Sequence, residues 1–414
     1  MRSTYAFWRT CILRFCAVAR PPALPPSLHC NQTEIASRKN FQKHHIMKKV
    51  FFFSAIVLVF STFAMGQNKN NTIQSGHENA ATVQQLGKNN TTNQVQSGNK
   101  NTASVSQLHA QENLANVNQS GNRNAAAVAQ VSGAAKNQVA VTQTGDLNKA
   151  TVLQSQASAN KVHVLQTGNV NTAQVNEQGA GVRFNQTNIE QRGNRNLGAV
   201  SQSGDVNHNL TNVSQLGDEN TAKVNQSGNI ELNTINIGQT GNLNAALVSQ
   251  NTQAHKNEIN VTQSGNHNTT QIGQEKTRET LTNVNQSGNW NQAKVAQTNA
   301  AYTETHIAQS GNENVASVQQ TDLTHSSAGI FQEGNVNTAA IKQLHSTQAA
   351  ATIVQPGDKN KATATQECAK QVSTVIKQTG NLNTAQTYQT GFNNQSNILQ
   401  SGNKNTATVK QTGM

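Results

Sequence analysis

The residues of this chain that could do chemistry are side-chain amides rather than acids, bases or nucleophiles. Gln and Asn recur throughout residues 67–414, and one set of Gln residues runs from Gln74 to Gln411 at a mean spacing of about 11.6 residues. Two residues before this Gln stands Val or Ile in 25 of 30 copies. An amide both donates and accepts hydrogen bonds, so a repeated amide can bond to its own copy in the next repeat. The pattern therefore predicts self-association through amide hydrogen bonds.

Groups suited to catalysis or metal binding form no comparable pattern. The nine histidines of residues 67–414 are scattered, and Cys368 is the only cysteine there. No carboxylate pair, nucleophile motif or phosphate-binding loop stands out, and the histidines lack metal-ligand spacing. Charged residues in the turns, such as Asp146 and Asp218, are expected only to solvate the surface. We therefore expect no enzyme activity, no cofactor and no metal.

The residues around each Gln predict a strand followed by a turn. Residues 220–226 read Asn-Thr-Ala-Lys-Val-Asn-Gln, so Asn, Ala, Val and Gln share one face of an extended segment. After the Gln comes x-Gly-x-x-Asn, as in residues 286–291. Gly and Asn tolerate the positive φ angles of tight turns. Each unit is thus a strand of about seven residues plus a turn of four or five.

The spacing between anchors reveals a longer repeat. From Gln191 to Gln378 it alternates between 11 and 12 or 13 residues, and the longer step follows a degenerate turn. The repeat is therefore two strands, about 23 residues, joined by one tight and one loose turn, and the 30 anchors make 15 such repeats. Gln178 departs from the pattern because Val175 stands three residues before it, which predicts either a β-bulge or a substitution at Glu177.

Stacked strand–turn–strand units predict an all-β fold, an amyloid-like β-solenoid of about 15 repeats with two facing parallel sheets. Ala and Val or Ile would fill a thin core, and inward amides would bond to their copies in adjacent rungs, since unpaired buried amides are costly. We expect this structural ladder to determine assembly, with the following representative members: Gln143, Gly145, Asn148, Ala150, Val152, Gln154, Gln215, Gly217, Asn220, Gln226, Gln286, Gly288, Asn291, Gln297, Gln400, Gly402, Asn405 and Gln411.

The ends of such a stack would expose unpaired strand edges. Residues 67–414 contain one proline, Pro356, which is placed in a turn, and no distinct capping segment is evident. Proteins usually protect such edges, because an open edge pairs with other chains. The sequence therefore predicts end-to-end addition of further copies.

The first 66 residues differ in composition from the rest. Residues 47–66 have a cationic start, an apolar middle and small residues before Gln67, which is the pattern of a secretory signal peptide. We interpret residues 1–46 as an upstream extension from a misplaced start site, with translation beginning at Met47. The chain's net charge of +12 falls to +4 over residues 67–414, so we expect no nucleic-acid binding.

These repeats resemble those of the curlin family, the secreted subunits of curli fibres on Gram-negative bacteria. The family pattern is similar to Ser-x5-Gln-x-Gly-x-x-Asn-x-Ala-x3-Gln, and residues 143–154, 215–226 and 286–297 match its Gln-to-Gln part. The resemblance implies an extracellular functional amyloid of a biofilm matrix, a homopolymer seeded by a nucleator subunit and exported through a dedicated outer-membrane channel. The leading Ser is often Asn here, and the repeats are more numerous than in typical members.

Two other functions compete with the structural subunit. A monomeric solenoid could act as a surface adhesin or a ligand-binding rod, although ice binding is disfavoured because the outward residues vary through Thr, Lys, Ala, Leu and Asn. A parallel β-helix enzyme acting on polysaccharide is the weaker alternative, because the chain has no aromatic cleft or acid cluster beyond the repeats. A rod that stays monomeric at high concentration would favour the adhesin.

Overall fold

The computed structural model describes residues 57–60 and 66–413. Residues 1–46, interpreted above as an upstream extension, lie outside the described part, as does the predicted signal peptide apart from residues 57–60 and 66. The chain divides into the units Met1–Phe52 and Phe53–Met414, and all described residues belong to the second unit. Within residues 57–60 and 66–413, no helix is long and apolar enough to cross a bilayer.

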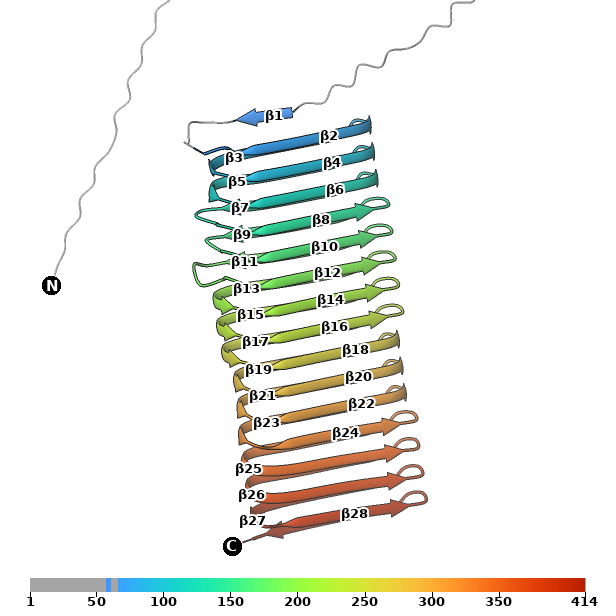
Figure 1. The fold of residues 1–414 in the computed structure, drawn as a ribbon. Helices are drawn as coiled ribbons and strands as arrows, with labels where there is room; N and C mark the ends of the chain where they lie inside the picture. Colours follow the sequence, from blue (N-terminus) through green and yellow to red (C-terminus); the bar gives the residue numbers. More distant parts are fainter. Residues whose placement is uncertain (1–56, 61–65, 414) are drawn as a thin grey trace, which may run out of the picture. The chain divides into compact units, whose positions relative to one another are not determined.

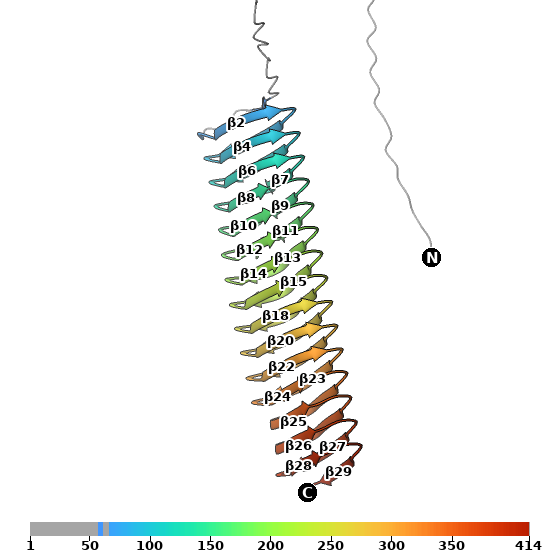
Figure 2. The ribbon, with the colours of Figure 1, turned by 90° about the vertical axis from the view of Figure 1, so that its right-hand side faces the viewer.

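The described residues form strands that alternate between two parallel sheets, with one strand of each sheet in every rung (Figures 1 and 2). The first sheet contains β2 (Lys69–His77), β4 (Thr91–Asn99), β6 (Leu114–Asn122), β8 (Gln138–Thr144), β10 (Lys161–Thr167), β12 (Gln186–Arg192), β14 (Leu210–Leu216), β16 (Thr234–Thr240), β18 (Glu258–Asn266), β20 (Leu281–Asn289), β22 (Glu304–Asn312), β24 (Ser327–Glu333) and β28 (Gln395–Ser401).

The second sheet contains β1 (Val57–Phe60), β3 (Ala80–Lys88), β5 (Thr102–Gln111), β7 (Ala125–Val131), β9 (Lys149–Ser155), β11 (Thr172–Gln178), β13 (Leu197–Asn207), β15 (Thr221–Glu231), β17 (Ala245–His255), β19 (Thr269–Arg278), β21 (Gln292–Ala301), β23 (Val315–Thr324), β27 (Thr384–Phe392) and β29 (Thr406–Thr412). The long strands β25 (Thr338–Pro356) and β26 (Lys361–Thr379) pass through both sheets. The predicted all-β solenoid of about 15 rungs is confirmed.

Neighbouring rungs pair in parallel and in register, so each repeat position lies beside its own copy. Between β20 and β22, for example, Val284 pairs with Ile307 and Gln286 with Gln309. Register shifts occur in three pairings of the second sheet, in each case shortly after the inward Gln, where the chain enters the loose turn. Variation in turn length is therefore absorbed at one edge, and the strands keep their alignment.

The core lies between the sheets and consists of small and branched apolar side chains. Burial alternates along most strands, as in β9, where Ala150, Val152 and Gln154 are buried. Because successive side chains of a strand point to opposite faces, one alternating sequence supplies both the core and the solvated surface. A buried Val or Ile contributes about 1.5–3 kcal/mol, so stability accumulates over stacked rungs and not within one.

A smaller apolar cluster lies beneath some of the loose turns and was not predicted. It contains buried side chains from five successive rungs, namely Ala157, Val182, Val206, Ile230 and Ala254. These turns are longer than the tight turns, and the cluster fills the space that their extra residues enclose. The loose edge thus has a local core of its own over this part of the stack.

Candidate functional site

The sequence-predicted ladder residues lie on the inward face of the strands and in the tight turns between the sheets. Those of the first sheet are Gln143, Gln215, Gln286 and Gln400, and those of the second are Ala150, Val152, Gln154, Gln226, Gln297 and Gln411. The tight turns hold Gly145, Gly217, Gly288 and Gly402 together with Asn148, Asn220, Asn291 and Asn405. Each of these positions lies in a row that runs along the stack.

In the first sheet, a continuous row of glutamine hydrogen bonds runs from Gln74 to Gln400. The Nε2 of each Gln donates to the Oε1 of the Gln in the next rung, at 2.6–3.0 Å. The same amide of Gln215 also donates to the backbone oxygen of Leu197 in the opposite sheet, at 3.0 Å. Each such amide therefore links successive rungs and ties the two sheets together, which satisfies a buried polar group.

The second sheet carries a similar row from Gln85 to Gln411, with one exception at Glu177. Gln154 donates to Glu177 at 2.8 Å, and Glu177 pairs in register with Gln154 and Gln202. Of the two predicted alternatives, the substitution at Glu177 is therefore correct and the bulge is wrong. The assignment of Gln178 as the anchor of this rung is also wrong, since its side chain is exposed.

Asparagines that end the tight turns form a third row, in which the hydrogen bonds between the asparagines run in the opposite direction. Asn148 accepts bonds at Oδ1 from the backbone N–H and the Nδ2 of Asn171 in the next rung, at 3.0 and 3.1 Å. Its own Nδ2 donates to the backbone oxygen of Gly168 at 2.7 Å. The stack therefore has a direction: glutamines donate toward the C-terminal end, whereas asparagine Oδ1 atoms accept from it.

Glycine is required in the tight turns because the next rung passes so close. Gly288 has a φ angle of 106°, and a Cβ at this position would overlap the backbone oxygen of Gly311. Gly402 in the last tight turn has a φ of 93°, but a Cβ there would meet only the Nδ2 of Asn405, at 3.8 Å. The difference arises because no described rung lies beyond Gly402.

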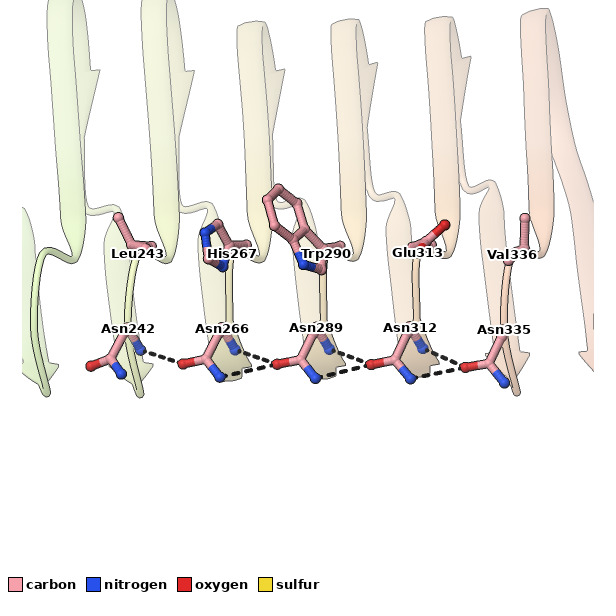
Figure 3. Close-up of a pocket in the computed structure, with 10 residues that line it drawn as sticks. All are labelled: Asn242, Leu243, Asn266, His267, Asn289, Trp290, Asn312, Glu313, Asn335 and Val336. Atoms are coloured by element: carbon pink, nitrogen blue, oxygen red, sulfur yellow. Dashed lines mark hydrogen bonds between the residues drawn. The ribbon is translucent and has the colours of Figure 1, made fainter.

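A fourth row of polar residues follows the outer rim of the tight turns (Figure 3). The Oδ1 of Asn289 accepts hydrogen bonds from the backbone N–H and Nδ2 of Asn266, at 3.0 and 3.2 Å. Asp218 holds the same position and accepts from Asn194 at 2.7 and 2.9 Å. The expectation that such aspartates only solvate the surface is therefore wrong. Their role depends on an amide 24 residues earlier, which the local sequence does not reveal.

The residue that follows this rim position has a left-handed backbone, whatever its side chain. Trp290 has a φ of 61° and Leu243 a φ of 59°, and both side chains are exposed. Trp290 stacks on His267 of the preceding rung, with the ring centroids 3.9 Å apart (Figure 3). The repeat therefore fixes the backbone of the turn, while this side chain is free to vary.

At both ends of the stack, ladder groups lack hydrogen-bond partners that the equivalent groups have in every inner rung of the first sheet. At the N-terminal end, the Oε1 of Gln74 is buried without a hydrogen-bond partner among the described residues. At the C-terminal end, the amide of Gln400 donates to Thr384 and the amide of Gln411 to Gln395, both at backbone oxygens. The donation toward a following rung has no acceptor in the described chain. The unpaired acceptor at the N-terminal end and the amide donor available at the C-terminal end are thus complementary.

The edges of the end strands differ in how they are covered. The outer edge of β3 pairs in parallel with β1, from Val57 to Phe60, whereas β2 has only β4 as a partner. At the other end, β28 and β29 each pair on one side only. The strand that covers the second sheet, β1, lies outside residues 67–414, for which open edges were predicted, so the N-terminal edge is covered only while residues 57–60 are part of the chain.

The described residues offer few groups for other chemistry. Within residues 57–60 and 66–413, no three His, Cys, Asp or Glu side chains gather closely enough to hold a metal ion. Cys368 is exposed and is not in a disulfide.

Comparison with known proteins identifies the repeat. Residues 136–168, 233–265 and 380–413 match the curlin associated repeat. No curated protein matches the chain. Residues 136–168 cover β8, β9 and β10, residues 233–265 cover β16, β17 and nearly all of β18, and residues 380–413 cover β27, β28 and β29. The match therefore falls on strands of both sheets and on the tight turns that build the glutamine and asparagine rows. The chain thus carries the curlin associated repeat at three places along its solenoid, and the resemblance to the curlin repeat family is confirmed.

Proposed function

We propose that this chain is a secreted structural subunit of curli-like extracellular amyloid fibres, which grow when copies stack end to end. The single observation that carries the proposal is the complementarity of the end rungs. Gln74 has a buried oxygen without a donor, and Gln400 has an amide whose forward hydrogen bond has no acceptor among the described residues. Stacking one copy on the next would place these two groups in the positions that neighbouring glutamines occupy within the chain.

Packing at the C-terminal end supports the same contact. Ala407 and Val409 occupy inward positions of β29, yet they are only partly buried, whereas the equivalent Ala385 is fully buried. A further rung would cover them and remove apolar surface from water. The last strands of both sheets pair in parallel and in register with the preceding rung, so an added copy needs no new geometry, because its first rung would repeat the last one.

The wider role follows from the curlin resemblance and is part of this proposal. We assign the fibre to a biofilm matrix, where it serves adhesion, and the chain to the cell surface of a Gram-negative bacterium. Residues 47–66 act as the signal peptide in this view. The expected partners are other copies of the chain, a nucleator subunit and a dedicated outer-membrane export channel. The role is structural and needs no catalytic group.

The second candidate is a monomeric adhesin or ligand-binding rod. One observation favours it: β1 covers the outer edge of β3, so half of the N-terminal end is protected while residues 57–60 remain on the chain. A protected edge cannot accept another strand. The two candidates therefore differ in whether the purified chain polymerises.

Assembly of the purified chain tests the proposal directly. We would follow an amyloid dye after removal of denaturant, image the products, and record fibre diffraction. Fibres much longer than the roughly 70 Å of a 15-rung stack, with spacings near 4.8 and 10 Å, are the expected result. Length is the decisive quantity, because a single solenoid already contains the strand spacing. A β-rich species that stays monomeric at high concentration, even with preformed ends added, would overturn the proposal and favour the adhesin.

A further inference from the structure

Glu177 interrupts the glutamine row of the second sheet with a buried acid. Its register partners are Gln154 on one side and Gln202 on the other, and its side chain has no exposed surface. Every other rung from Gln85 to Gln411 has Gln at this position. A group that ionises has therefore replaced a neutral amide in the interior of the stack.

The direction of the hydrogen bonds shows what this replacement lacks. Away from Glu177, each inner Gln of this row accepts from the preceding rung and donates to the following one, as Gln107, Gln130 and Gln250 do. Glu177 accepts from Gln154 at 2.8 Å through Oε2, and Gln202 donates onward to Gln226 at 2.7 Å. Between Glu177 and Gln202 no hydrogen bond is formed, and the buried Oε1 of Gln202 has no donor among the described residues. A carboxylate has no hydrogen to give, whereas a carboxylic acid has one.

We propose that Glu177 is a proton-binding site, at which the folded chain takes up one proton from solvent and donates it in a hydrogen bond to the Oε1 of Gln202. The neutral acid then does what the amide does in the other rungs, and the row becomes continuous from Gln85 to Gln411. Thr187, across the core, donates to the Oε1 of Glu177 at 3.4 Å, which leaves the other oxygen and the acid hydrogen for the two neighbours in the row.

The surroundings of Glu177 favour the neutral form. Burial raises the pKa of this carboxyl group from 4.5 to about 7, against the smaller opposing effect of hydrogen bonds from Gln154, Thr187 and Asn160. Among the described residues, no positively charged side chain faces Glu177 to stabilise a carboxylate. The charged and titratable residues on the strands that pack against β11 all have partly or wholly exposed side chains: Lys149, Lys161, His163, Glu190, Arg192 and Asp205.

The consequence is that this rung is more stable in acid than at neutral pH. The carboxyl group of Glu177 binds its proton more tightly in the folded chain than in the unfolded chain. The stability that Glu177 contributes is therefore fully present below pH 4.5 and is lost as pH rises toward about 7. Between these two pH values, the ratio of the folded to the open form of this rung falls about tenfold for each pH unit. Because the rung lies inside the chain, this inference is independent of the proposed function and holds for a fibre subunit or a monomer.

Amide hydrogen exchange measured on the full chain between pH 4.5 and 8 tests the inference. After correction for intrinsic exchange rates, protection of β11 and β13 should fall about 100-fold over this range. Glu177→Gln should abolish this fall, whereas the matched Glu190→Gln on the partly exposed face of β12 should keep it. Equal pH profiles for the parent chain and Glu177→Gln would overturn the inference.

Difference infrared spectroscopy provides a second readout that does not depend on stability. At pH 5.5 to 6, ordinary carboxyl groups are largely ionised, so a carboxylic-acid band in the parent spectrum that disappears in Glu177→Gln would come from Glu177. We expect this band. Its absence would show an ionised Glu177 and refute the proton-binding site.

Discussion

Gln378 donates a hydrogen bond of 2.8 Å to Gln400, which is the last bond of the first-sheet row. Gln400 itself has the same backbone bond to the opposite sheet that inner glutamines have, but the described chain has no further first-sheet Gln to accept its amide. The amide geometry of an inner rung is thus maintained at the end of the stack. An added copy would meet a preformed donor, which reduces the ordering cost of binding.

Removing the terminal amides should weaken fibre growth. In Gln400→Ala with Gln411→Ala, an incoming rung loses two hydrogen bonds, each worth about 0.5–1.5 kcal/mol, so the critical concentration should rise about tenfold or more. Seeded growth followed by light scattering measures it. Lys404→Ala with Lys410→Ala, at exposed positions nearby, should change growth little. Similar effects in both double variants would count against inward amides as the determinant of assembly.

Gly402 and Gly288 should respond differently to the same substitution. Gly288→Ala introduces a Cβ that overlaps Gly311 and should disrupt folding of its rung, whereas Gly402→Ala should cost only the left-handed strain of about 1–2 kcal/mol. In a fibre, however, Gly76 of the next copy would lie against Gly402. We therefore expect Gly402→Ala to fold and to block growth at this end.

A control for these glycines is available within the core strands. Gly273 of β19 does not have a positive φ, and a Cβ built there meets nothing within 4 Å. Gly273→Ala should therefore affect neither hydrogen-exchange protection nor the elongation of seeds. If Gly402→Ala seeds elongate as fast as Gly273→Ala seeds, the proposed stacking at this end is wrong.

The rim aspartates should contribute measurably to local stability. Asp218→Ala removes two hydrogen bonds to Asn194, and we expect a loss of about 0.5–1.5 kcal/mol, reduced by the exposure of this turn. Asp218→Asn should retain the bonds, because other rungs have Asn at this position. Exchange rates of the amides in residues 192–196 report the effect. Asp205→Ala, at an exposed position near the end of β13, is the matched control, and a loss of equal size there would contradict the assigned role.

Most of the fold could be predicted because the sequence repeats it in every rung. The alternation around Val224 and Gln226 predicts the strand, its inward face and the amide row, and the Gly and Asn that follow the tight-turn Gln residues predict the turn. Each position is sampled many times in one chain, so a single irregular copy does not obscure the pattern. The parallel register follows, since only in-register stacking brings identical amides together.

The features that were missed depend on contacts between rungs or on irregular segments. The pattern around Gln178 fits a bulge or a substitution equally well, and only the pairing of Glu177 with Gln154 and Gln202 decides between them. The cluster that includes Val182 and Ile230 lies under loose turns whose length varies, so no period marks it. The strand β1 lies in a segment whose composition indicates a signal peptide.

Removal of residues 1–66 should accelerate growth at the N-terminal end. This truncation deletes β1 and exposes the edge of β3, from Ala81 to Gln84, to which β1 pairs. In the longer chain an incoming rung must displace β1 before it can pair with β3, whereas the edge of β2 is open in both. Seeds made from the two chains, with the same soluble chain added, should therefore elongate faster at this end when residues 1–66 are absent. Imaging with labelled monomer distinguishes the two ends. Growth at the C-terminal end, where β28 and β29 are unchanged, is the internal control, and equal rates at the N-terminal end would show that β1 does not protect it.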